Sequence, residues 1–279
     1  MLPLPRFPQT SDKRGFTLIE LSIVLVIVGL IVGGILVGRD LIEAAKIRAT
    51  VSQIQQYKVA ANTFRLKYNG LPGDLTKSIA QDLGFTIRAG SAGHGDGNGI
   101  IEGCSAAAVG TLTKIGCETA VFWHDLSDAK LVAGTYSGTD GFIGFARLDE
   151  NDFGIVPSAM AAPPIGATGS YLPEAKIQNG NYFIIYADTS KNFFEIAGVT
   201  SGSLVGAYTL SNALTPLQAY NIDIKLDDGL PLTGKVIATE GTGPDIVAVP
   251  GAATCVLTGG VSYNVAMTTM LCHSSMAAD

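Results

Sequence analysis

Hydrophobic positions form one unbroken run near the N-terminus of the chain. Residues 16–38 contain a single ionisable side chain, Glu20. A helix crosses the hydrocarbon core of a bilayer with about 20 apolar residues, so this run predicts a membrane-spanning helix. Beyond Arg39 the sequence resembles that of a water-soluble domain, rich in Gly, Ala, Thr and Ser.

A hydrophobic periodicity extends this helix beyond the apolar run. Side chains recur at alternating spacings of three and four residues, which is typical of a half-buried helix face. They are Ile47, Thr50, Ile54, Tyr57, Ala61, Phe64 and Tyr68. Asn69-Gly70 and then Pro72 end the pattern. We therefore expect one helix over residues 16–68, about 80 Å long at the usual rise per residue.

Residues 69–279 predict a head that contains both helices and strands. Residues 118–132 favour a helix with Trp123 and Leu126 on its buried side. The runs 182–187 and 192–197 are rich in aromatic and β-branched residues around a short polar turn, as in an antiparallel hairpin. The expected fold class is α+β, in which the second half of a long helix packs on a head with an antiparallel sheet.

A further helix is expected from Pro216 to Leu226. Thr215 before Pro216 is a favourable N-cap followed by proline at the first helical position. Asp227-Asp228-Gly229 after it reads as a helix stop rather than a metal site.

Charges around the apolar run predict its orientation. Lys13 and Arg14 lie directly before it, and the charges after it balance: Arg39, Asp40, Glu43 and Lys46. By the positive-inside rule the N-terminus stays in the cytoplasm, and everything after Gly38 is exported.

All four cysteines then lie on the exported side, where disulfides persist. They are Cys104, Cys117, Cys255 and Cys272. Three connectivities are possible. Sequence proximity favours Cys104–Cys117 and Cys255–Cys272, each of which closes a short loop worth about 3 kcal/mol in the chain-entropy model.

The net charge argues against binding to nucleic acid. The whole chain carries −6, and the first fifteen residues carry +2, so the remainder carries −8. Such a chain has no excess of cations to neutralise phosphates. The sequence also contains no GxxxxGK[ST] phosphate loop, HExxH helix or GxSxG serine. Cys272-His273 could be a nucleophile and its base, but an exported cysteine is more typical of a disulfide.

The residues before the apolar run carry the most specific motif. KRGFTLIEL, residues 13–21, combines a basic pair, a glycine, an aromatic residue and a carboxylate five positions into the apolar run. It resembles the signal of type IV prepilins and type II secretion pseudopilins. The resemblance implies that a prepilin peptidase cuts after Gly15 and methylates Phe16. It also implies other pilin or pseudopilin subunits and an inner-membrane assembly machinery as partners.

Glu20 needs a physical reason for its place in the apolar run. A charge in a bilayer costs about 2.5–3.5 kcal/mol on insertion scales. Cutting before Phe16 creates an α-amino group that can pair with Glu20 within one helix at i,i+4. The resemblance implies a second option, in which Glu20 neutralises the Phe16 amine of a neighbouring subunit and sets the register between them. The alternative is that Glu20 lies at the membrane surface and reaches water.

A glycine-rich loop over residues 93–103 is the strongest candidate site in the head. Asp96, Asn98 and Glu102 offer side-chain oxygens, and Ile100 offers a carbonyl. Calcium takes 6–8 oxygen ligands in such loops, and some pseudopilins are stabilised by calcium. The alternative is a tight turn with solvated side chains.

Together these patterns predict a leader (1–15), a long helix (16–68, with the membrane or filament core at 16–38) and an exported head (69–279). The expected protein is a structural subunit rather than an enzyme. It begins as a single-pass inner-membrane protein, with its N-terminus in the cytoplasm and its head in the periplasm, and ends in a pilus or pseudopilus. The alternatives are a minor tip subunit or adhesin, and a membrane-anchored periplasmic binding protein or enzyme.

Overall fold

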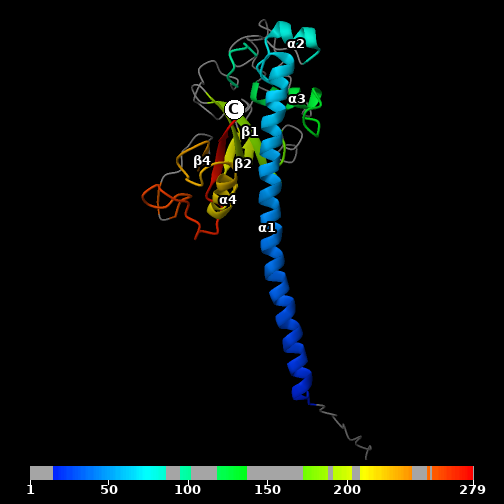
Figure 1. The fold of residues 1–279 in the computed structure, drawn as a ribbon, viewed down its shortest axis with the longest axis vertical. Coiled ribbons are helices and arrows are strands. Elements are labelled where there is room, and N and C mark those ends of the chain that lie inside the picture. Colours follow the sequence, from blue (N-terminus) through cyan, green and yellow to red (C-terminus); the bar gives the residue numbers. More distant parts are fainter. Residues whose placement is uncertain are drawn as a thin grey trace, which may run out of the picture. The chain divides into compact units, whose positions relative to one another are not determined.

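A computed structural model describes residues 15–85, 95–101, 118–136, 172–187, 191–202, 208–240, 250–251 and 253–278. Its helices are α1 (Leu18–Tyr68), α2 (Lys77–Leu83), α3 (Glu118–Asp128) and α4 (Pro216–Leu226). Its strands are β1 (Asn181–Ala187), β2 (Asn192–Gly202), β3 (Tyr208–Ser211), β4 (Val236–Thr239) and β5 (His273–Ala277) (Figure 1). The chain divides into two compact units, Met1–Ala45 and Lys46–Asp279.

The first unit contains the apolar part of α1. The most apolar 18-residue window of this helix has a mean hydropathy of 2.9, and none of it is buried. Large apolar side chains are exposed all round the helix from Leu18 to Ile42. Within the described residues, α1 is the one helix that is long and apolar enough to cross a membrane.

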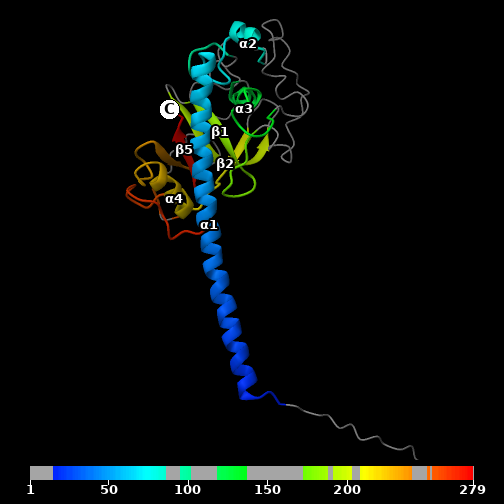
Figure 2. The ribbon, with the colours of Figure 1, turned by 45° about the vertical axis from the view of Figure 1, so that its right-hand side comes forward.

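The second unit is the head, and it includes the remainder of α1. The predicted stripe from Ile47 to Phe64 is buried, and Tyr68 is partly buried against the same core. Tyr57 contacts Trp123 of α3 and Phe183 of β1, with ring centroids 4.9 and 5.1 Å away. Edge-to-face contacts of this kind stabilise aromatic pairs beyond their buried area. The two views show α2 and α3 beside the C-terminal end of α1 (Figures 1 and 2).

Three helix ends differ in detail from the sequence expectation. α1 begins at Leu18 rather than at Phe16. α1 ends at Tyr68 as predicted, but Asn69 rather than Gly70 takes the left-handed conformation, with φ 55°. α3 ends at Asp128 rather than Val132. Lys130 adopts φ 58°, and the N–H of Leu131 donates back to the carbonyl of Leu126 at 2.9 Å. This left-handed cap stops the helix before the apolar residues that follow.

The sheet is antiparallel, in the order β1-β2-β5-β4, and β3 also pairs with β2. The predicted hairpin is confirmed, with Ala187 opposite Asn192 and Asn181 opposite Gly198. In the sheet, Phe194 pairs with Met276, and Met276 with Val236. All three side chains are buried, and Phe194 lies 5.9 Å from Trp123 between ring centroids. The core therefore joins α1, α3 and one face of the sheet.

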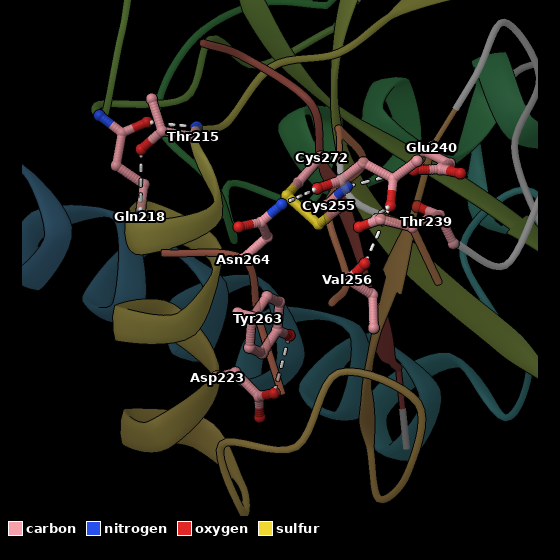
Figure 3. The surroundings of a disulfide bond; sticks show 12 residues. Thr215, Gln218, Asp223, Thr239, Glu240, Cys255, Val256, Tyr263, Asn264 and Cys272 are labelled. Carbon is pink, nitrogen blue, oxygen red and sulfur yellow. Dashed lines mark hydrogen bonds between the residues drawn. A yellow bond between two sulfur atoms is a disulfide. The ribbon is translucent and has the colours of Figure 1, made fainter. Parts of the chain in front are cut away.

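The C-terminal part of the head is closed by the Cys255–Cys272 disulfide, with the Cα atoms 5.2 Å apart (Figure 3). The N–H groups of Ala213 and Leu214, just before α4, donate to the carbonyl of Cys272 at 2.9 Å. One of the two favoured cysteine pairs is thus confirmed. Cys104 and Cys117 lie outside the described residues.

Candidate functional site

The N-terminus of α1 is closed by a reciprocal pair of hydrogen bonds between Thr17 and Glu20. The backbone N–H and the hydroxyl of Thr17 both donate to Glu20 Oε2 at 2.8 Å. The N–H of Glu20 donates to Thr17 Oγ1 at 3.3 Å. This is a capping box, and its T-x-x-E pattern is readable in the sequence, although the sequence analysis above did not use it. It satisfies N–H groups that an apolar segment has no other means to bond.

The second oxygen of Glu20 is free for another partner. In the described part of the chain, Glu20 Oε1 makes no hydrogen bond or ion pair. Gly15 and Phe16 precede the first helical turn, and the Phe16 side chain is 90% exposed. The Gly15–Phe16 bond therefore lies in non-helical backbone directly before a capped helix.

Residues 10–36 match a family model described as the prokaryotic N-terminal methylation motif. The chain carries the type IV prepilin-like signature. The match covers the five residues before Gly15, the Gly15–Phe16 bond, Glu20 and most of the apolar half of α1. A search of the curated proteins and a search of the solved structures found no significant match.

In the head, the glycine loop surrounds a carboxylate that the sequence analysis did not place there. The N–H of Gly97 donates to Asp74 Oδ1 at 2.8 Å, and the N–H of Gly99 donates to Asp74 Oδ2 at 2.7 Å. Both glycines have positive φ, 78° and 87°. Alternating glycines in this conformation turn successive N–H groups toward one anion. The loop is therefore a nest for the chain's own Asp74.

The predicted calcium ligands make hydrogen bonds within the loop. Asp96 Oδ1 accepts the N–H of Asn98 at 3.0 Å, and Asn98 Oδ1 accepts the N–H of Ile100 at 2.7 Å. Glu102 lies outside the described residues. The structure therefore places Asp96, Asn98 and Ile100 in one loop but does not test whether they bind calcium.

Two further carboxylates lie beside Asp96. Ligand oxygens of Asp74, Asp96 and Glu118 all lie within 4.8 Å of one another. Glu118 is buried, and its Oε1 accepts the N–H of Gly95 at 2.7 Å. Burial raises the pKa of Asp74 to about 6, although the N–H groups of Gly99 and Gly97 oppose the shift. Such a cluster gains stability from either a proton or a cation, and carboxylate oxygens suit a hard cation such as calcium.

A second acidic group follows α4. Asp223 is buried and accepts the hydroxyl of Tyr263 at 2.8 Å (Figure 3). It also accepts the N–H of Gly229 at 3.2 Å. Burial raises the pKa of Asp223 to about 6. Asp227 caps the end of α4 and accepts N–H groups of Lys235 and Val236. These carboxylates hold the loop between α4 and β4, as expected of a helix stop.

The Cys272-His273 pair is not arranged as a nucleophile with its base. Cys272 is in the disulfide. Nδ1 of buried His273 lies 2.9 Å from Glu195 Oε1, which also accepts the hydroxyl of Thr239 at 3.2 Å. Glu195 of β2 thus links His273 of β5 and Thr239 of β4 through buried polar contacts.

Proposed function

We propose that this chain is a prepilin that is cleaved after Gly15, methylated at Phe16 and assembled into a type IV pilus or a type II secretion pseudopilus. The observation that carries the proposal is the methylation motif at residues 10–36, on a helix whose apolar half is exposed all round. The resemblance of this signature to known prepilins makes prepilin peptidase and other pilin subunits the expected partners.

The exposed apolar helix supplies the driving force for both membrane insertion and assembly. Each Å² of apolar surface removed from water contributes roughly 25 cal/mol. A bilayer removes that surface from water first, with the N-terminus in the cytoplasm and the head in the periplasm. Packing among the helices of neighbouring subunits keeps it from water once the subunit leaves the membrane.

Glu20 gives that packing a register. Its Oε2 is engaged by Thr17 of the same helix, and its Oε1 remains free to accept the α-amino group of Phe16 from a neighbour. In a medium of low dielectric constant, opposite charges attract strongly, and the attraction depends strongly on the distance between them. The pairing would therefore favour one axial offset between subunits.

The experiment compares filament assembly by Glu20→Gln with that by wild type. Glutamine also completes a capping box, so the substitution removes the charge while keeping the helix cap. Asp40→Asn, which neutralises an exposed carboxylate of α1 beyond the apolar run, is the matched control. Filaments are sheared from cells, and the chain is quantified in the filament and membrane fractions.

We expect wild type and Asp40→Asn in the filament fraction, and Glu20→Gln cleaved but retained in the membrane. If Glu20→Gln assembles as wild type does, the charge of Glu20 has no role in assembly. If wild type never enters the filament fraction in cells that assemble filaments, the proposed function itself is wrong.

A further inference from the structure

Three asparagines of the head, Asn69, Asn98 and Asn179, are each followed by a glycine. Asparagine before glycine is especially prone to deamidation, because glycine has no side chain to hinder attack of its nitrogen on the asparagine side chain. All three pairs lie outside the helices and strands. The hydrogen bonds made by each pair therefore decide which of them can react in the folded protein.

Deamidation requires the glycine nitrogen to lose its proton and attack Cγ of the asparagine. A bond forms between that nitrogen and Cγ, and the bond from Cγ to Nδ2 breaks, so that ammonia leaves. Water then opens the cyclic imide at one of its two carbonyl groups. Opening at Cγ gives aspartate, and opening at the main-chain carbonyl gives isoaspartate. The net change is one water taken up and one ammonia lost, without an enzyme or a redox partner.

The Asn98–Gly99 pair is held at each of the groups that this reaction uses. The N–H of Gly99 donates to Asp74 Oδ2 at 2.7 Å. The Asn98 side chain donates to Asp96 Oδ2 at 3.0 Å and accepts the N–H of Ile100 at 2.7 Å. A carboxylate stabilises the N–H that it accepts, and its negative charge disfavours the nitrogen anion that loss of the proton would leave. We expect this pair to react slowly.

The Asn179–Gly180 pair is protected by one contact. The N–H of Gly180 donates to Glu174 Oε1 at 2.9 Å. Among the residues that the structure describes, this pair has no further hydrogen bond or ion pair. The effect of one carboxylate on the reaction can therefore be measured here by a single substitution.

The Asn69–Gly70 pair has no such protection. Neither the N–H of Gly70 nor the side chain of Asn69 makes a hydrogen bond in the described part of the chain. Asn69 is exposed directly after α1, and both residues line a cavity of about 400 Å³. Rotation of the asparagine side chain toward the glycine nitrogen breaks no hydrogen bond here, and water can reach the imide.

We propose that Asn69 is a site of spontaneous deamidation in the folded protein, and that Asn98 and Asn179 are protected from it. The reaction converts a neutral amide into a carboxylate at the C-terminal end of α1, where the helix dipole disfavours negative charge. Isoaspartate also adds one carbon to the main chain between α1 and the segment that carries Asp74. The modification therefore accumulates with age at the residue where α1 leaves for the loops of the head.

Peptide mapping of the full-length chain in detergent micelles tests the proposal. The folded chain is incubated at mildly alkaline pH in water enriched in heavy oxygen, so that each deamidation during the incubation is labelled. The three peptides are quantified by mass spectrometry at intervals. The same measurement on the chain unfolded in guanidinium gives the intrinsic rate of each pair. Glu174→Ala removes the carboxylate beside Gly180, and Asp82→Ala, which removes an exposed carboxylate of α2, is the matched control.

We expect Asn69 to react about tenfold or more faster than Asn98 and Asn179 in the folded chain, because hydrogen bonds to charged groups are among the strongest. In the unfolded chain the three rates should be similar. Glu174→Ala should raise the rate at Asn179 by about tenfold and leave the rate at Asn69 unchanged. Asp82→Ala should change neither rate.

The proposal is overturned if Asn69 reacts no faster than the other two asparagines in the folded chain. It is also overturned if Asn179 reacts at the wild-type rate in Glu174→Ala, because the contact with the carboxylate would then not be what protects it. None of these outcomes depends on whether the chain assembles into filaments.

Discussion

Two buried carboxylates, Asp74 and Asp223, hold loops of the head by accepting backbone N–H groups. Their burial removes water that would otherwise stabilise the charge, and the hydrogen bonds compensate only in part. The pKa of each is raised from 3.8 to about 6 as a result. These residues therefore make the stability of the head depend on pH.

For Asp223 the sign of this dependence follows from linkage. The folded state keeps a proton that the unfolded chain releases between pH 3.8 and about 6. The stabilisation from the protonated carboxyl is full below pH 3.8 and is lost as the pH rises through about 6. Asp223→Asn cannot ionise, so its free energy of unfolding should rise relative to that of wild type over this window.

Chemical denaturation at a series of pH values measures this difference. Asp82→Asn, which changes an exposed carboxylate of α2, is the control and should follow wild type. If the wild type instead gained stability relative to Asp223→Asn as the pH rises, the raised pKa of Asp223 would be contradicted.

Calcium binding at Asp96, Asn98, Ile100 and Glu102 remains a prediction, and it can be tested through the nearby carboxylates. If a calcium ion binds, it relieves the repulsion among the carboxylates of Asp74, Asp96 and Glu118, which lie within 4.8 Å of one another. The melting temperature at neutral pH should then rise with calcium, fall with EDTA, and respond less in Asp96→Asn than in Asp82→Asn. An unchanged melting temperature in calcium and EDTA would contradict the calcium prediction. The loop N–H groups would then stabilise the Asp74 carboxylate without a metal ion.

The sequence predicts the glycine-rich loop but not the carboxylate that the loop surrounds. Alternating glycines allow the left-handed backbone conformations that other residues rarely adopt, and Gly95, Gly97 and Gly99 have positive φ values. The identity of the carboxylate that they surround was missed, because Asp74 lies 23 residues before Gly97. Only the packing of α1 and α3 brings Asp74 and Glu118 to the loop.

Among the secondary-structure elements, local signals predicted α1, α3 and α4, whereas α2 was not predicted. α4 occupies Pro216–Leu226 as expected, with a capping box between Thr215 and Gln218. Proline, the N-cap hydroxyl and the acidic stop are all local to the sequence, so they do not depend on the remainder of the fold. The β1–β2 hairpin was likewise predicted from residues that are close together in the sequence.

Thr215→Ala tests the cap of α4. It removes the hydroxyl that accepts the N–H of Gln218 at 3.3 Å, and loss of an N-cap hydrogen bond costs about 1 kcal/mol. Thr76→Ala is a matched control, because Thr76 is the N-cap of α2 but makes no side-chain capping bond. We expect the free energy of unfolding to fall clearly more for Thr215→Ala than for Thr76→Ala. Equal losses would contradict the role given to the Thr215 hydroxyl.

The strands β4 and β5 were not predicted. β5 has the sequence HSSMA, which has little intrinsic preference for a strand. It is a strand because it pairs on both sides, with β2 and with β4. Such pairing joins residues far apart in the sequence, such as Phe193 with Ala277 and Val236 with Met276, and no local pattern shows it. Burial of His273 against Glu195 has the same non-local origin.

In the molecule as a whole, the Cys255–Cys272 disulfide joins the loop around Cys255 to the residue directly before β5. Both cysteines are fully buried, and they are 17 residues apart. A cross-link of this length lowers the entropy of the unfolded chain enough to stabilise a protein by about 3 kcal/mol. Replacement of both by alanine should lower the free energy of unfolding by about that amount. A double variant as stable as the oxidised wild type would contradict this role.

The division of the chain into a helix and a head was readable from composition, since the apolar excess is confined to residues 16–38. The capping box of Thr17 and Glu20 adds a purpose for Glu20 that does not depend on a partner. The proposed cut before Phe16 would leave that box intact while adding a cation one turn away. Processing and helix capping are therefore compatible at the same few residues.

The proposed function depends above all on cleavage of the Gly15–Phe16 bond, and the mass of the mature N-terminus reports that cleavage. The protein is isolated from membranes of cells that contain a prepilin peptidase, digested, and its N-terminal peptide is analysed by mass spectrometry. We expect a peptide that begins with N-methylated Phe16. A mature protein that retains Met1, or that begins after Gly38, would contradict it.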